Sequence, residues 1–235
     1  MIGILGGMGP EATLDLYRCI INLTPAHRDQ DHIRVLIYSN PKIPDRTKAI
    51  AADGESPLPQ LVESARLLEK GGAGIIAMPC NAAHHYLPEV RKAVHIPFLD
   101  MIEETSRKLR ILLPNAKNVG LMASIGTSCS GVYARSLSAV GVGLLMPDTE
   151  DQLRIEAAIN QVKAGIHNRL TQKTFQSIGL QLITGGAEAV ILGCTEIPLA
   201  FNANDVAYPI LNPTEILAEA TVDWALERRS ATASA

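Results

Sequence analysis

The strongest constraint in this 235-residue sequence is an internal repeat that ends at a cysteine in both copies. Gly-Gly-Ala at 71–73 leads through an apolar run to Cys80, and Gly-Gly-Ala at 185–187 leads through a second apolar run to Cys194. The two cysteines are separated by 114 residues, and so are the two glycine pairs. The repeat predicts a duplicated βα design with a thiol at the matching strand end of each copy. Two thiols that face each other across a cleft would form an acid/base pair.

Apolar runs alternate with amphipathic stretches along the whole chain. The expected strands lie at 2–5, 35–38, 74–78 and 97–99, and again at 119–123, 142–146, 189–192 and 209–212. The expected helices lie at about 11–23, 58–70, 88–93, 100–113, 150–184 and 214–227, before a small and polar tail at 229–235 that we expect to be disordered. Continuous apolar strands separated by helices predict parallel sheets that are covered on both faces.

The similar order of strands and helices in the two halves predicts an α/β fold with two pseudo-symmetric domains, each a parallel sheet flanked by helices. Residues 1–100 together with about 208–235 would form the first domain, and residues 101–207 the second. Ligands of open parallel sheets bind beyond the carboxyl ends of the strands. We therefore expect an active site in the cleft between the domains, where the residues just past strand ends converge: 6–9, Ser39, Asn40, Cys80, Asn81, 124–127, Cys194 and Thr195.

Composition argues against several classes of function. Hydrophobic residues make up 47% of the chain and charged residues 19%, and the net charge is −3, as in an ordinary globular protein. The cationic residues are scattered, so no nucleic acid partner is expected. Apolar runs fall far short of the roughly 20 residues that a membrane span requires. The chain starts with an apolar run and a glycine turn, without the pattern of a signal peptide, and a cytoplasmic location is the expectation.

The glycine turn at 6–9 matches neither GxGxxG nor GxxxxGK[ST], so we expect it to approach a small substrate rather than a nucleotide. The four cysteines are too few and too widely spaced for a disulfide framework, and none forms the CxxC of a zinc site. Cys19 and Cys129 are expected to be structural. Cys80 and Cys194 instead follow their strands in polar loops, where modest tuning of a thiol pKa near 8.5 would give one thiolate and one thiol.

Removing a proton from one face of a carbon and returning one to the other face inverts a stereocentre, which is general acid/base work. The carbanion between the two steps requires cations or hydrogen-bond donors. The stretches 4–10, 40–47, 78–81, 101–105 and 193–196 resemble the aspartate racemases of the aspartate/glutamate racemase superfamily, in order and over essentially the whole chain. The resemblance implies a racemase that interconverts L- and D-aspartate as a homodimer, with no cofactor, no pyridoxal phosphate and no metal.

The resemblance also implies roles for individual residues. Cys80 and Cys194 would be the two bases. Arg46 and Lys163 would hold the side-chain carboxylate of the substrate, although Lys163 also fits an exposed helix face. The α-carboxylate and amino group would be held by Asn81, the backbone of Ala82 and Ala83, and Thr195, while Met8 and Thr127 line the pocket and Asn40 and Glu196 complete the substrate-binding set.

Three points stay open from the sequence. Glu196 is placed either to tune Cys194 or to cap the next helix, and His84 and His85 either assist Cys80 or start a helix. The family usually reads Cys-Asn-Thr-Ala where this chain has Ala82 as the third residue, so one hydroxyl is missing at a cost on the order of 1 kcal/mol. The alternatives are therefore a racemase of glutamate or of a broader range of amino acids, a decarboxylase or isomerase of a small diacid, or a binding protein for acidic amino acids.

Overall fold

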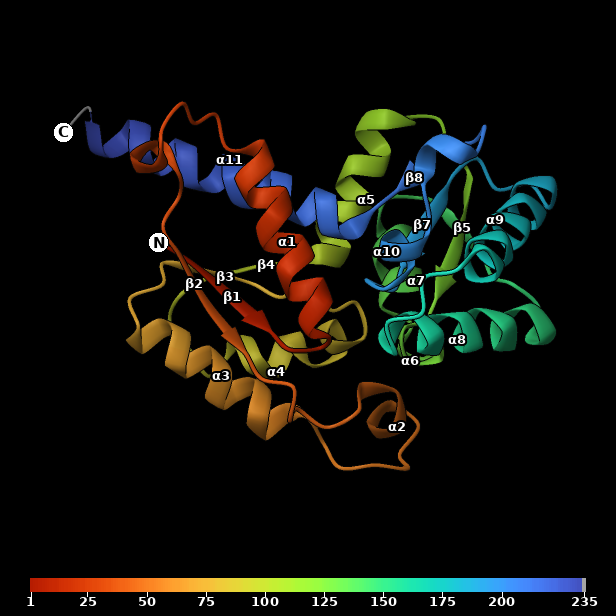
Figure 1. Ribbon diagram of the computed structural model, residues 1–235, viewed down its shortest axis with the longest axis horizontal. Helices are drawn as coiled ribbons and strands as arrows, with labels where there is room; N and C mark the ends of the chain where they lie inside the picture. The colour runs from red at the N-terminus through yellow and green to blue at the C-terminus, as the bar shows by residue number, and fades with distance from the viewer. Residues whose placement is uncertain (234–235) are drawn as a thin grey trace.

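Two parallel sheets of four strands each dominate the computed structural model, which describes residues 1–233, with side chains described as far as Arg228 (Figure 1). The first sheet has the strand order β2-β1-β3-β4 and the second has the equivalent order β6-β5-β7-β8. Every strand pair is parallel. The expected α/β fold with two similar parallel sheets flanked by helices is confirmed.

The first sheet consists of β1 (Ile2–Gly6), β2 (Val35–Ser39), β3 (Ile75–Ala77) and β4 (Phe98–Leu99), with helices α1 (Pro10–Leu23), α2 (Arg46–Ile50), α3 (Leu58–Lys70) and α4 (Leu87–Arg91) and 3₁₀ turns η1 (Asp29–Asp31) and η2 (Ala82–Tyr86). Helix α5 (Met101–Leu112) then leads into the second sheet. That sheet consists of β5 (Asn118–Ala123), β6 (Gly143–Leu145), β7 (Val190–Gly193) and β8 (Ile210–Leu211), with helices α6 (Ile125–Ser130), α7 (Val132–Ala139), α8 (Thr149–Lys163), α9 (Arg169–Thr184) and α10 (Ile197–Ala200) and the 3₁₀ turn η3 (Ala203–Asp205). The last helix, α11 (Pro213–Ala233), returns along the first half.

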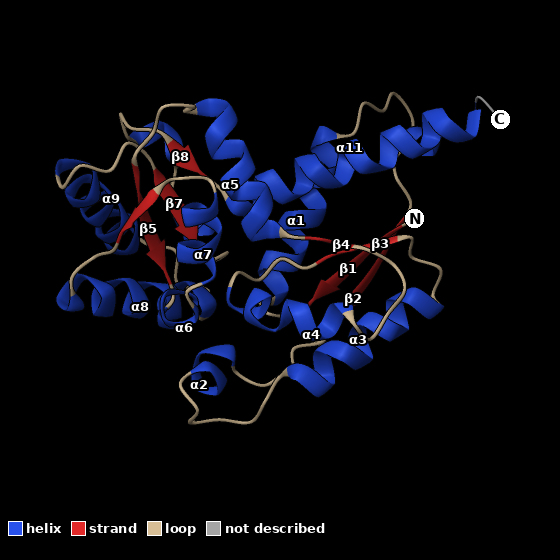
Figure 2. Ribbon diagram, turned by 180° about the vertical axis from the view of Figure 1, so that it is seen from behind, coloured by secondary structure: helices blue, strands red, loops and turns tan. Residues whose placement is uncertain are grey.

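Both faces of each sheet are buried, which explains why the strands read as continuous apolar runs. In the first sheet Ile2 and Ile4 pack under α1 and α11, whereas Leu5 and Ile76 pack under α3 and α4. In the second sheet, alternate residues face α8 and α9 on one side and α5 and α7 on the other (Figure 2). Each fully buried aliphatic side chain stabilises the fold by about 1.5–3 kcal/mol. Because such side chains point alternately to the two faces of a sheet, helices pack stably on both faces.

The Gly-Gly-Ala repeat is a helix C-cap. Gly72 has φ +87° and Gly186 has φ +102°, both in the left-handed region that favours glycine. The next amide closes the turn in the same way in both copies, because Ala73 N–H donates to Leu68 O at 3.0 Å and Ala187 N–H donates to Leu182 O at 3.0 Å. The repeat therefore sets how α3 and α9 turn into β3 and β7, and hence where each cysteine lies.

The long helical region expected over 150–184 consists of two helices, α8 and α9. Gly165 between them has φ +77°, and Asn168 forms a capping box with Thr171 that starts the second helix. The glycine and the cap residue outweigh the helical pattern on either side, because one ends a helix and the other begins one. Lys163 thus lies at the very end of α8.

The second sheet also ends later than the domain boundary expected at about residue 208. β8 pairs with β7, with Ile210 opposite Val190, so the chain returns to the first half only after Leu211. The division into two domains stays a prediction. The expected disordered tail is wrong for residues 229–233, which continue α11, while residues 234–235 lie outside the described part of the chain.

The two halves are joined by α5 and by α11, which pack against each other. Lys108 of α5 and Glu219 of α11 form an ion pair at 2.6 Å across this contact. Within residues 1–233, every helix is too short or too polar to cross a lipid bilayer.

We predict that Gly186→Ala lowers the free energy of unfolding by about 1–2 kcal/mol, since alanine at φ +102° is strained. Nothing lies within 4 Å of the added Cβ, so the cost is purely conformational. The matched control is Gly185→Ala in the same turn, where φ is −74°, a backbone conformation that alanine adopts readily. Urea unfolding of the three proteins is the measurement, and equal midpoints for the two variants would contradict the prediction.

Candidate active site

The carboxyl ends of the two sheets meet at a small cavity of about 30 Å³, which has room for about two water molecules. Helix α2 of the first half closes it by packing on α6 of the second (Figure 2). The approach is so close that a Cβ on Gly126 would lie 2.8 Å from the Cα of Thr47. Both halves line the cavity, with Met8, Asp45, Arg46, Thr47, Cys80, Asn81 and Ala82 from the first and Ser124, Thr127, Lys163, Cys194, Thr195 and Glu196 from the second.

The two cysteines of the repeat both reach this cavity. Cys80 follows β3 and Cys194 follows β7, and these strands hold the same place in their sheets. Both thiols are free, and the residues are only 6% and 7% exposed. Because parallel strands bring their carboxyl ends to one edge, the duplication in sequence becomes a pair of thiols at one site. The other free cysteines, Cys19 and Cys129, do not line the cavity.

Glu196 is bonded to the second cysteine. The Cys194 thiol donates to Glu196 Oε2 at 3.0 Å, and the Thr195 hydroxyl donates to the same oxygen at 3.2 Å. Burial raises the pKa of Cys194 well above its usual range, the negative charge of Glu196 raises it further, and Lys163 opposes both effects. Glu196 also stands before α10 but makes no side-chain cap there, so its contacts are those of a residue that tunes Cys194.

Two cationic side chains reach the cavity from different halves. Burial by itself would lower the pKa of Lys163, but the negative groups around it, led by Cys194 and Glu196, raise the pKa overall. Arg46 starts α2, and its Nη1 donates to the carbonyl oxygens of Ile43 at 3.1 Å and Pro44 at 2.9 Å. Arg46 Nε is buried and has no hydrogen-bond partner within the described residues. These contacts hold the guanidinium at the cavity and leave one donor unused.

Asn81 likewise has one side-chain amide atom that is hydrogen-bonded and one that has no partner among the described residues. The Tyr133 hydroxyl donates to Asn81 Oδ1 at 2.6 Å, while Asn81 Nδ2 is buried without a partner in the described part of the chain. Buried polar groups in proteins are nearly always hydrogen-bonded, so an orphaned donor indicates a place for a ligand. Two residues that line a single cavity, Arg46 and Asn81, therefore each carry such a donor.

The structure brings most of the expected substrate-binding residues to the cavity, but not all. Asn40 does not line it, because its amide donates to Gln60 and its oxygen accepts from the Lys42 amide. Ala83 does not line it either, since it is fully buried in the core of the first half. Asp45 and Thr47 were missed although they flank Arg46, and nothing in the sequence singled out Tyr133.

The sequence predicts that the glycine turn approaches a small substrate. In the structure, the middle of this turn packs against the protein's own backbone. A Cβ on Gly7 would lie 2.3 Å from the Asn40 carbonyl carbon, and the Gly7 amide donates to the Thr13 hydroxyl at 2.9 Å. Only Met8 of this turn lines the cavity. The glycines thus pack β1 against the loop after β2.

His84 holds the backbone around Cys80, whereas His85 is exposed against the ring of Tyr86. The Met101 amide donates to His84 Nε2 at 3.1 Å, so the other ring nitrogen carries the proton and donates to the Cys80 carbonyl at 2.9 Å. His84 therefore links the turn after β3 to the start of α5. No hydrogen bond joins the imidazole to the thiol among the described residues.

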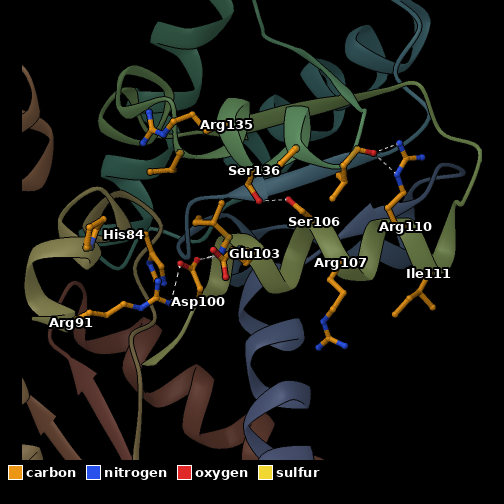
Figure 3. A pocket seen from close by; sticks show the side chains of 15 residues that line it. His84, Arg91, Asp100, Glu103, Ser106, Arg107, Arg110, Ile111, Arg135 and Ser136 are labelled. Carbon is orange, nitrogen blue, oxygen red and sulfur yellow. Dashed lines mark hydrogen bonds and ion pairs between the residues drawn. The ribbon is translucent and has the colours of Figure 1, made fainter. Parts of the chain in front are cut away.

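A larger cavity of about 770 Å³ lies behind this turn, between α4, α5 and α7 (Figure 3). Neither Cys80 nor Cys194 lines it. Its guanidinium groups are bonded locally, Arg91 to Asp100, Arg107 to Glu104 and Arg110 to the Val140 carbonyl. The small cavity, with its thiols and unused donors, is therefore the candidate active site. Over the described residues, no three side chains of His, Cys, Asp or Glu gather as metal ligands would.

Comparison with known proteins identifies the family of the chain. Residues 5–221 match the Asp/Glu/Hydantoin racemase family. The chain is 30% identical to the broad specificity amino-acid racemase RacX of Bacillus subtilis (strain 168) over 239 residues, which cover 98% of this chain and 100% of that protein.

Solved structures are similar over the same extent. An aspartate racemase of Picrophilus torridus superposes with a TM-score of 0.84 at 31% identity, covering 95% of this chain and 93% of that one. An aspartate racemase homologue of Pyrococcus horikoshii OT3 has a TM-score of 0.77 at 26% identity, covering 96% and 98%. A glutamate racemase of Francisella tularensis, at 17% identity, shares the fold with a TM-score of 0.74, covering 97% and 81%.

We predict that His84 makes the protein less stable in mild acid. Burial lowers the pKa of His84 below its usual 6.5; Asp100 opposes this shift and Arg91 adds to it. The unfolded chain therefore binds the proton first as the pH falls through 6.5, and the free energy of unfolding falls by up to about 1.4 kcal/mol per pH unit below that point. His84→Gln, which cannot titrate, loses this slope.

Urea unfolding at about pH 7.5, 6 and 5 measures the slope. The matched control is His85→Gln at the exposed neighbouring position, which keeps the wild-type pH dependence. A His84→Gln protein with the same slope as the wild type would show that another group is responsible.

Proposed function

Because the chain belongs to the Asp/Glu/Hydantoin racemase family, we propose that it racemises aspartate by proton transfer between Cys80 and Cys194, without a cofactor. One observation carries the proposal: two free cysteines from equivalent strand ends line one cavity together with two cationic side chains. Membership of the family supports racemase activity, and hence an isomerase. The substrate and the two-cysteine scheme are the proposed part.

In the proposed reaction the Cα of the substrate lies between the two sulfur atoms. A thiolate on one face takes the α-proton, and the electron pair of the broken C–H bond spreads into the α-carboxylate. The thiol on the other face then gives its proton to Cα, so the configuration is inverted. The enzyme ends with its proton on the opposite cysteine and is ready for the opposite enantiomer. Donors and cations around the carboxylates stabilise the intermediate.

The protonation of Cys194 assigns the two roles in the ligand-free state. Its thiol donates to Glu196, and its raised pKa keeps it protonated near neutral pH. We therefore propose Cys194 as the acid in this state and Cys80 as the base. In the reverse direction Cys194 acts as the thiolate, the form in which it is left after giving its proton to Cα, and Lys163 is the neighbour that favours this form.

The orphaned donors support an acidic amino acid as substrate. A buried donor without a partner costs about 1–3 kcal/mol, and a carboxylate that accepts from it removes this cost. Arg46 Nε and Asn81 Nδ2 are such donors, and Lys163 adds a positive charge. We propose that Arg46 and Lys163 hold the side-chain carboxylate and that Asn81 and Thr195 hold the α-carboxylate and amino group. The 30 Å³ cavity is too small for an amino acid, so its lining must open for the substrate to bind.

A broader substrate range is the second candidate function. The relative from Bacillus subtilis is a broad specificity amino-acid racemase, and Ala82 removes one hydroxyl from the lining of the cavity. Racemisation of glutamate, reactions of other small diacids and binding without turnover are the remaining alternatives. We further propose a cytoplasmic homodimer that acts on free amino acids. Chiral chromatography of aspartate, glutamate and neutral amino acids after incubation with the protein separates these possibilities.

We predict that Cys80→Ala and Cys194→Ala each reduce racemisation of aspartate by at least about 10⁴-fold, because either change removes one of the two proton carriers. Chiral chromatography of the product is the measurement of racemisation. Incorporation of deuterium at Cα by the wild type in heavy water excludes a binding protein, which cannot catalyse the exchange. The matched control is Cys129→Ala, at a free and exposed cysteine, which keeps wild-type activity. Near-normal racemisation by either single variant would rule out the two-base scheme.

We also predict that Arg46→Met lowers kcat/KM for aspartate by about 100-fold, since hydrogen bonds to charged groups contribute up to about 3 kcal/mol. Any turnover of alanine, which has no side-chain carboxylate, changes by less than about threefold. Lys48→Met, an exposed cation on the same short helix, is the control and keeps the wild-type value. Equal losses for aspartate and alanine would mean that Arg46 does not select the side-chain carboxylate.

A further inference from the structure

Tyr133 connects the two halves of the molecule at the candidate active site. It lies on α7, packed against the second sheet, and only 1% of it is exposed. Its hydroxyl donates to Asn81 Oδ1 at 2.6 Å, and Asn81 is the residue after Cys80 in the first half. A side chain of one half thus holds the polar neighbour of a catalytic thiol in the other.

The hydroxyl of Tyr133 is a permanent donor. Burial raises the pKa of Tyr133 far above its usual value, so the phenol keeps its proton throughout the physiological range. Thr105 on α5 opposes this shift in the pKa of Tyr133 without reversing it. The amide oxygen of Asn81 is the acceptor for the phenol proton, and the amide nitrogen is left at the opposite end.

That nitrogen is one of the two orphaned donors described above. Asn81 is 2% exposed, and its Nδ2 has no partner within the described residues. An amide rotated by 180° would present its oxygen to the ligand instead, and an acceptor facing a carboxylate is repulsive. The orientation of this amide therefore decides whether Asn81 attracts or repels an anionic substrate.

We infer that Tyr133 is a positioning residue that holds the Asn81 amide with its N–H₂ group toward the substrate carboxylate. The inference rests on the proposed function, since it assigns an anionic substrate to the cavity. Tyr133 acts through Asn81 and does not touch the reacting atoms. Its effect belongs mainly to substrate binding, because the amide orientation matters as soon as a carboxylate enters the site.

Tyr133→Phe tests the inference, because it keeps the ring and removes only the hydroxyl. With the amide free to rotate, KM for aspartate rises about tenfold and kcat falls by less than about threefold, as expected when one charge-assisted hydrogen bond is weakened. The matched control is Ser136→Ala on the same helix, which removes the 2.8 Å hydrogen bond between Ser136 and Ser106 without touching Asn81 (Figure 3). Its KM stays within twofold of the wild type.

A double-mutant cycle separates positioning from packing. If Tyr133 acts through the amide, adding Tyr133→Phe to Asn81→Ala changes kcat/KM by less than about twofold. If Tyr133 only packs or ties the halves together, its tenfold effect persists in the Asn81→Ala background, and the inference is wrong. Deuterium exchange at Cα is sensitive enough to measure the low rates of the double variant, and unfolding midpoints verify that all variants are folded.

The activity of the wild-type protein distinguishes a failure of the proposed role of Tyr133 from a failure of the proposed function. A wild type that racemises aspartate, together with a Tyr133→Phe protein of unchanged KM, overturns the role of Tyr133 and leaves the proposed function standing. A wild type that exchanges deuterium into none of the amino acids tested overturns the proposed function, and the inference about Tyr133 fails with it.

Discussion

Parallel strand pairing is the constraint on which the rest of this structure depends. Because all four strands of a sheet run in one direction, every turn after a strand opens at the same edge. The turn after β3 carries Cys80 and the turn after β7 carries Cys194, so two edges that face each other bring the two thiols to one cavity. The long connections that parallel strands require become the helices that bury both faces of the sheets. The site is thus a consequence of the architecture.

The charges around the cavity are balanced so that opposite protonation states can coexist. Glu196 accepts a hydrogen bond from Cys194 and favours its thiol, while Lys163 favours the thiolate. The electrostatic effect is mutual: Cys194 and Glu196 raise the pKa of Lys163, whereas burial lowers it. A pair of bases that exchange roles in each direction of a reaction needs such an environment, in which neither form is favoured by every neighbour.

Polar groups behind the cavity hold the residues that line it. His84 bonds the carbonyl of Cys80 to the first turn of α5, and Tyr133 bonds the side chain of Asn81 from α7. Two buried donors of residues that line the cavity, Arg46 Nε and Asn81 Nδ2, have no partner within the described residues. An unsatisfied buried donor destabilises the empty protein, and it becomes favourable only when a ligand accepts from it. These donors therefore lower the stability of the empty protein and would raise its affinity for a ligand that accepts hydrogen bonds from them.

The sequence by itself determined the strands, most helices, the duplication and the two cysteines, because these depend on local periodicity, on glycines with positive φ and on the strand ends that follow. It also contained the signals for the break between α8 and α9, in Gly165 and Asn168, although the helical pattern around them concealed it. Only the tertiary structure decided that Asn40 and Ala83 turn away from the cavity, that Glu196 bonds Cys194 and that Tyr133 reaches Asn81. The last contact joins residues 52 positions apart in different halves, and no local pattern encodes how two halves face each other. That arrangement follows from the packing of α5, α11, α2 and α6, and it alone converts two strand ends into a site.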